Sequence, residues 1–183
     1  MGASGLPRAS VHRVWSRLRS AVLLVVVTVA VAVAPATASP AAARPRPPAC
    51  LEVSVTGVGR DLGNLRTEGE LSDGSYRVAS TQAAFRPLGL SGTVLGFEGP
   101  LVITPTRVPG TITAQLVGTV DVVTGRFTAT SAELTGTGPL HDVTGTLVVD
   151  GVQPGSTFTE TVSGTLCIAA ARERFLVRAF TAP

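Results

Sequence analysis

Residues 135–145 contain three glycines and one proline, and they lie between two strand-like segments, 126–134 and 146–150. Glycine allows sharp turns and close backbone approaches, whereas proline cannot donate a hydrogen bond to a strand ladder. A chain that leaves one strand, turns through such a run and enters another strand builds an antiparallel sheet. We therefore interpret residues 135–145 as the tight crossing of a closed antiparallel sheet.

Apolar and polar residues alternate along much of the chain, which is typical of strands with one buried face. In residues 110–121, for example, Ile112, Ala114 and Leu116 share one face. Threonine and valine, which favour strands, dominate these segments. We predict eight or nine strands joined mostly by short turns: 50–57, 75–83, 92–98, 100–104, 110–121, 126–134, 146–150, 157–168 and 174–180.

The remaining segments predict turns and loops rather than helices. Residues 59–74 indicate a long loop or an irregular pair of short strands, and residues 85–89 indicate a turn. No segment beyond residue 49 shows a 3.6-residue period, and only residues 169–174 could form a helical turn. The fold class is therefore all-β, and antiparallel chains of this kind form sandwiches or barrels.

The first 38 residues have the organisation of a secretory signal peptide. Four arginines precede a 14-residue apolar run, Ala21–Ala34. Small residues follow at the positions expected before a cleavage site, and the last of them is Ala38. The run is shorter than the roughly 20 residues that span a bilayer, so no permanent membrane anchor is expected after cleavage. We predict a signal peptide (1–38), a Pro/Ala-rich linker (39–49), a β-barrel domain (50–183) and a secreted, extracellular protein.

Cleavage after Ala38 would change the charge of the chain. It would remove four of the 15 arginines and none of the 12 acidic residues, leaving a net charge of −1, and the chain has no lysine. A cationic surface for nucleic acid is therefore not indicated, and no nucleic-acid partner is expected.

Residues 136–145 resemble the glycine motif of the allene oxide cyclase and dirigent barrels. Gly136, Thr137, Gly138, Val143 and Gly145 fit that motif, and the resemblance extends over about residues 100–168. It implies an antiparallel eight-stranded β-barrel (allene oxide cyclase/dirigent/lipocalin-like) with a cavity. Proteins of this kind shape a reactive intermediate in an apolar pocket, but none of their catalytic or guiding residues can be matched here.

The chain has two cysteines, Cys50 and Cys167. An even number in an exported protein suggests a disulfide, and the alternative is two separate thiols. Cys50 opens the first predicted strand and Cys167 lies near the end of a late one, and these strands are neighbours in a closed barrel. Because Leu51 and Leu166 would face inward, we expect both sulfur atoms on the outer face.

No residue pattern identifies a catalytic or metal site. His141 is the only histidine after residue 38, and one histidine without a free cysteine cannot make the usual zinc site. We interpret His141 as a solvated loop residue, and we expect neither a metal nor a cofactor. We expect four polar residues near a barrel mouth, as pocket or rim residues: Tyr76, Arg77, Glu98 and Arg107.

Three functions remain open, and we favour a protein that binds or guides a small apolar molecule in the barrel interior without catalysis. The alternatives are a cyclase- or isomerase-type enzyme of the allene oxide cyclase class and a structural or interaction barrel with a filled core. A pocket larger than a few water molecules would exclude the filled core. A Glu, Tyr or Arg pointing into that pocket would favour the enzyme.

Overall fold

The computed structural model describes residues 46–181. The predicted signal peptide (1–38) and most of the predicted linker lie outside the described residues. Within the described part, residues 46–48 have no regular secondary structure and lead directly into the first strand at Ala49. Residues 46–181 contain one helix of more than one turn, and it has eight residues. No helix in this part of the chain is long and apolar enough to cross a membrane.

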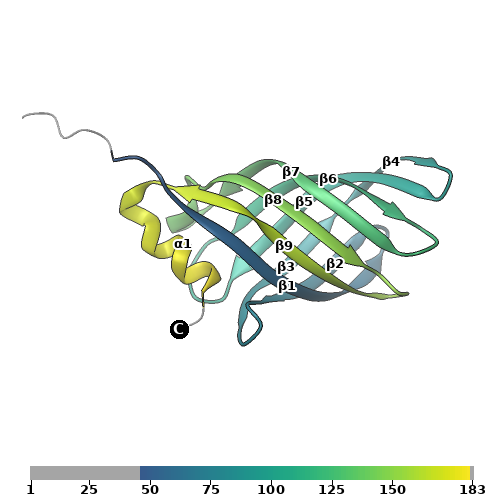
Figure 1. The fold of residues 1–183 in the computed structure, drawn as a ribbon, viewed down its shortest axis with the longest axis horizontal. Helices are drawn as coiled ribbons and strands as arrows, with labels where there is room; N and C mark the ends of the chain where they lie inside the picture. Colours follow the sequence, from purple (N-terminus) through teal and green to yellow (C-terminus); the bar gives the residue numbers. More distant parts are fainter. Residues whose placement is uncertain (1–45, 182–183) are drawn as a thin grey trace, which may run out of the picture. The chain divides into compact units, whose positions relative to one another are not determined.

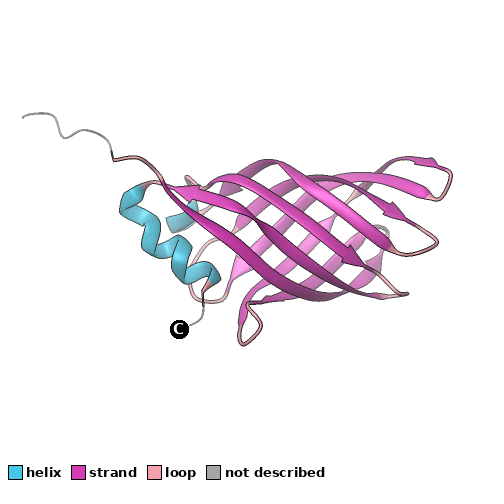
Figure 2. Cartoon of the chain, in the orientation of Figure 1, coloured by secondary structure: helices cyan, strands magenta, loops and turns pink. Residues whose placement is uncertain are grey.

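The domain is a closed antiparallel β-barrel of eight strands with one additional short strand (Figures 1 and 2). Neighbours pair in the order β3-β2-β1-β9-β8-β7-β6-β5, and pairing between β3 and β5 closes the sheet. The strands are β1 (Ala49–Gly63), β2 (Arg66–Ser72), β3 (Arg77–Ala84), β4 (Arg86–Ser91), β5 (Val94–Pro105), β6 (Ile112–Asp121), β7 (Arg126–Gly136), β8 (Thr144–Val152) and β9 (Thr157–Ile168). The predicted fold class is confirmed.

Strand β4 replaces the turn that was predicted at residues 85–89. It pairs with the first half of β5, whereas β3 pairs with the second half, so β3 and β4 act as one strand interrupted at Phe85. The two strands predicted around Gly99 are in fact one, β5. A Cβ atom at Gly99 would overlap the carbonyl oxygen of Ala84, so glycine allows the interrupted strand to cross β5 closely.

The last predicted strand, 174–180, is wrong. Residues Glu173–Phe180 form helix α1, preceded by a 3-10 turn (η2) at Ala170–Arg172. The buried side chains of α1 are Leu176, Ala179 and Phe180, which follow the i, i+3, i+4 spacing of a helix face. Helix α1 contacts β1, β3 and β9 and packs at the end of the barrel where β1 begins (Figure 1). We call this the helix end.

The glycine-rich run forms the predicted tight connection at the helix end. Strand β7 ends at Gly136, a 3-10 turn (η1) covers Gly138–Leu140, and β8 begins at Thr144. Leu140 and Val143 are buried in the core, so this short connection helps to seal the barrel. A Cβ atom at Gly136 would overlap the carbonyl oxygen of Leu140, which explains why glycine is needed there.

The Cys50–Cys167 disulfide is present, and it joins β1 to β9. The two cysteines are register partners with Cα atoms 4.0 Å apart. Val53 and Leu166 point into the core, whereas Cys50 is exposed and Cys167 half-buried. The sulfur atoms therefore lie on the outer face, as strand alternation predicted.

Candidate functional site

The barrel interior contains a cavity of about 90 Å³ at the end opposite to α1. We call this the open end, because it carries the β1–β2, β4–β5, β6–β7 and β8–β9 turns instead of a helix. A water molecule needs roughly 10–15 Å³ on this measure, so the cavity has room for several waters or a small organic group. The filled-core alternative is therefore not favoured. The lining residues are Asp61, Leu65, Thr67, Thr81, Ala83, Phe85, Phe97, Leu101, Leu116, Val120, Phe127, Ala129, Val149, Gln153, Phe158 and Glu160.

One part of the cavity wall is aromatic and aliphatic. The rings of Phe85 and Phe97 lie with centroids 4.9 Å apart, and those of Phe127 and Phe158 meet edge to face at 6.2 Å. Small residues such as Ala83 and Ala129 also line the wall. The interior wall is therefore predominantly apolar, and small inward residues leave space between the rings.

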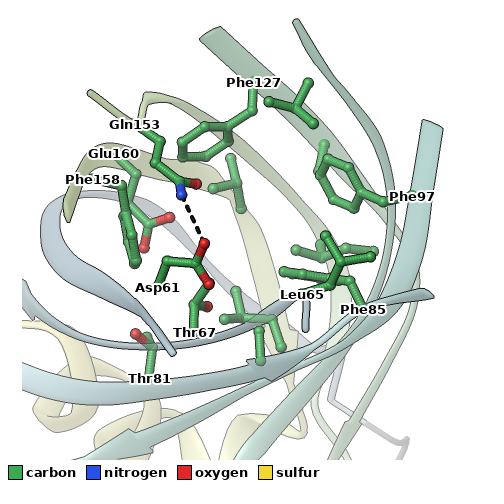
Figure 3. A pocket seen from close by; sticks show the side chains of 16 residues that line it. Asp61, Leu65, Thr67, Thr81, Phe85, Phe97, Phe127, Gln153, Phe158 and Glu160 are labelled. Carbon is green, nitrogen blue, oxygen red and sulfur yellow. Dashed lines mark hydrogen bonds between the residues drawn. The ribbon is translucent and has the colours of Figure 1, made fainter. Parts of the chain in front are cut away.

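The polar residues of the cavity gather on one side, opposite Leu65, Phe85 and Phe97 (Figure 3). Asp61 comes from β1, Gln153 from the β8–β9 turn and Glu160 from β9. Gln153 Nε2 donates to Asp61 Oδ2 at 3.1 Å and to the carbonyl oxygen of Gly155 at 3.2 Å. The amide thus ties the β8–β9 turn to β1 at the mouth, where both side chains are half-buried.

Glu160 points inward because it shares the inner face of β9 with Phe158 and Val162, both buried. Its register partners on either side are Gly57 on β1 and Gly151 on β8. A Cβ atom at Gly57 would lie 2.6 Å from Glu160 Cγ, so this glycine makes room for the carboxyl. Burial raises the pKa of Glu160 to about 7, because little water remains to solvate its charged form.

The four residues proposed from the sequence as pocket or rim residues do not line the cavity. Tyr76 is 55% exposed in the β2–β3 turn at the helix end. The neighbouring Arg77 pairs with Glu70 at 2.6 Å on the surface. Glu98 pairs with Arg86 on the outer face of β5 and β4. Arg107 donates to the carbonyl oxygen of Thr181 at 3.2 Å, also at the helix end.

His141 is exposed at the β7–β8 connection, as expected for a loop residue. Its Nδ1 lies 3.0 Å from the carbonyl oxygen of Gly138, and Arg172 lies beside the ring. Arg172 also pairs with Asp142 at 3.3 Å. This group fastens the connection to the segment before α1, and it belongs to the helix end rather than to the cavity.

Sequence reasoning missed the cavity residues Asp61, Gln153 and Glu160, although one signal was present. Glu160 stands between Phe158 and Val162 at inward positions, so the alternation of β9 could have found it. Asp61 lies beyond the predicted end of the first strand. Gln153 is in a turn, where alternation does not apply.

Within residues 46–181, no group of three or more His, Cys, Asp or Glu side chains is placed to hold a metal ion. No family model, curated protein or solved structure matches this chain. The resemblance to the allene oxide cyclase and dirigent barrels therefore stays a prediction. The fold and the cavity define an eight-stranded antiparallel barrel with a mostly apolar interior chamber at one end.

Proposed function

We propose that this protein binds a small, mostly apolar molecule in the cavity at the open end, without catalysing a reaction. The observation that carries the proposal is the chamber itself, with four phenylalanines in its wall and a few polar groups gathered on one side. Small-molecule sites usually combine an apolar lining with a few polar groups that orient the ligand.

The surroundings of the mouth support the entry of an apolar molecule. Exposed apolar side chains lie in the turns and strand ends of the open end: Leu62, Leu90, Val94, Val122, Val123 and Val152. Two of these residues, Val122 and Val123, lie in a turn whose shape is held by Asp121. Its carboxylate accepts hydrogen bonds from the backbone N–H groups of Thr124 and Val123 at 2.9 Å, and these bonds lower the pKa of Asp121.

We expect small apolar compounds to raise the melting temperature of the domain, because a ligand that binds only the folded state stabilises it. A thermal-shift panel of single-ring compounds tests this. In the variant Ala129→Leu, which fills the cavity from β7, the shift should disappear. The matched control Ala132→Leu changes an exposed position of the same strand and should keep the shift. If no compound stabilises the wild type, the proposal fails.

A second candidate function, proton transfer, has one specific observation in its favour. Glu160 points into the cavity and has a pKa near 7, which suits a general acid or base. This would be the role of an isomerase- or cyclase-type enzyme. Compounds are incubated with the protein, recovered and analysed by mass spectrometry to separate the two functions. Conversion of a compound that is abolished in Glu160→Gln favours the enzyme, and recovery of unchanged compounds favours the binding protein.

We propose that the protein is exported and acts outside the cell. The basic and apolar order of residues 1–38 supports this, and so does the disulfide, which indicates an oxidising compartment. Protein recovered from the culture medium should have a mass that corresponds to a chain starting at Ser39. A recovered chain that still contains Trp15 would contradict the proposed cleavage.

A further inference from the structure

The charged residues of the cavity wall are all acidic. Its lining contains Asp61 and Glu160 but no arginine or histidine, and the chain has no lysine. A bound molecule with a negative charge would face two carboxyls and no positively charged side chain in the lining. A molecule with a positive charge would find an acceptor on the polar side of the chamber and apolar surface on the other side.

Resting on the proposed binding function, we infer that the ligand is a small amine: a protonated amino group attached to an apolar, ring-sized body. The amino group lies against the carboxyl of Glu160, and the body occupies the space between the phenylalanine rings. Asp61, Gln153 and Glu160 lie on one side of the chamber and face Leu65, Phe85 and Phe97 on the other (Figure 3), so the chamber offers an acceptor for the amino group and apolar surface for the body.

The two carboxyls are not equally available. Asp61 already accepts a hydrogen bond from Gln153 at 3.1 Å. Glu160 is half-buried, and no hydrogen bond or ion pair within residues 46–181 involves its carboxyl. Buried charges in proteins are normally paired, so the ionised form of Glu160 lacks the partner that an ammonium group would supply.

The groups around Glu160 do not supply that partner. Asp61 on β1 faces the same chamber and is itself acidic, and Thr67 and Thr81 on β2 and β3 are neutral. On the outer side of the barrel wall, Arg126 and Asp150 line a surface groove that also reaches Glu160. Arg126 makes no ion pair among residues 46–181.

The aromatic wall favours a cation as well. Phe158 is two residues from Glu160 on the inner face of β9, and Phe127 meets it edge to face. A cation within about 6 Å of a ring centroid is attracted by the face of the ring. An ammonium group beside Glu160 is therefore stabilised by the carboxylate and by nearby aromatic rings together.

Binding of an amine beside Glu160 should depend on pH. Burial keeps Glu160 protonated up to about pH 7, and a bound cation would favour its charged form, so binding of the amine releases a proton from the carboxyl. The affinity for an amine therefore rises with pH until Glu160 is ionised. A ligand that accepts a hydrogen bond from the protonated carboxyl would show the opposite trend.

The test compares benzylamine with benzyl alcohol, which has nearly the same shape and no charge, by calorimetric titration of the wild-type protein. We expect benzylamine to bind about tenfold more tightly near pH 8 than near pH 5.5, and benzyl alcohol to show no such change. Glu160→Gln should abolish the preference for the amine while benzyl alcohol still binds. Glu133→Gln, which removes an exposed carboxyl from β7, should behave as the wild type.

The outcomes separate this inference from the function on which it rests. If the two compounds bind equally at both pH values, or if affinity for the amine falls as pH rises, the inference is overturned and the binding function stands. The inference is also overturned if Glu160→Gln keeps the preference for the amine. If neither these two compounds nor the single-ring panel binds, the proposed function fails with it.

Discussion

Replacing both Cys50 and Cys167 with alanine is expected to lower the free energy of unfolding by about 5 kcal/mol. The disulfide links residues 117 positions apart, and in the chain-entropy model closing a loop of that length restricts the unfolded state by this amount. Both sulfur atoms lie on the outer face, so their removal leaves no hole in the core. Urea unfolding monitored by circular dichroism gives the measurement.

The double variant is expected to fold, because β1 and β9 remain paired from Ala49 to Arg60 without the disulfide. Its unfolding should depend more steeply on urea than that of the wild type, since an unlinked chain exposes more surface when it unfolds. Reduced wild-type protein is the control and should match the double variant. If the free energy of unfolding of the double variant is lower than that of the wild type by less than about 1 kcal/mol, the chain-entropy model is contradicted.

Replacing Glu160 with glutamine is expected to stabilise the domain at pH 8 and to have little effect near pH 4.5. Burial raises the pKa of Glu160 from 4.5 to about 7, so the folded state holds this proton to higher pH than the unfolded state. The contribution of Glu160 to the free energy of unfolding is therefore fully present below about pH 4.5, and it is lost as the pH rises through about 7. Between these pH values, the free energy of unfolding of Glu160→Gln should rise relative to that of the wild type by about 3 kcal/mol at most.

Urea unfolding of the wild type and Glu160→Gln across this pH range measures the effect. The free energy of unfolding of the wild type should fall relative to that of the variant as pH increases, and the gap should level off above pH 7. Glu133→Gln removes a carboxyl from the exposed face of β7 and should follow the wild type. Parallel curves for the wild type and Glu160→Gln would show that Glu160 is not buried as described.

Alternation was sufficient to predict most of the barrel. It identified Ile112, Ala114 and Leu116 as sharing one face, and all three are buried, because a strand with one covered face must repeat every two residues. The same rule placed the cysteines on the outer face of adjacent strands. The glycine-rich connection at residues 136–145 was also predictable, since glycine is required where backbones approach closely.

The C-terminal segment and the β3–β4 region could not be predicted in this way. Helix α1 has eight residues, which allows only about two turns, too few to establish a helical period in the sequence. It is stabilised by packing Leu176, Ala179 and Phe180 against the helix end, a contact that exists only when the barrel is closed. Strand β4 likewise exists because β5 extends past Gly99 and offers it a pairing edge.

The sequence by itself determined the sheet class, the disulfide and the inward direction of residues such as Ile112 and Leu116, because these depend on local alternation and on which strands begin and end the chain. Only the tertiary structure decided that Asp61, Gln153 and Glu160 share one chamber. They come from two strands and a turn that meet when β9 pairs with β1. Closure of the barrel removes water from around Glu160, and that loss of solvation gives a carboxyl in a strand its unusual pKa.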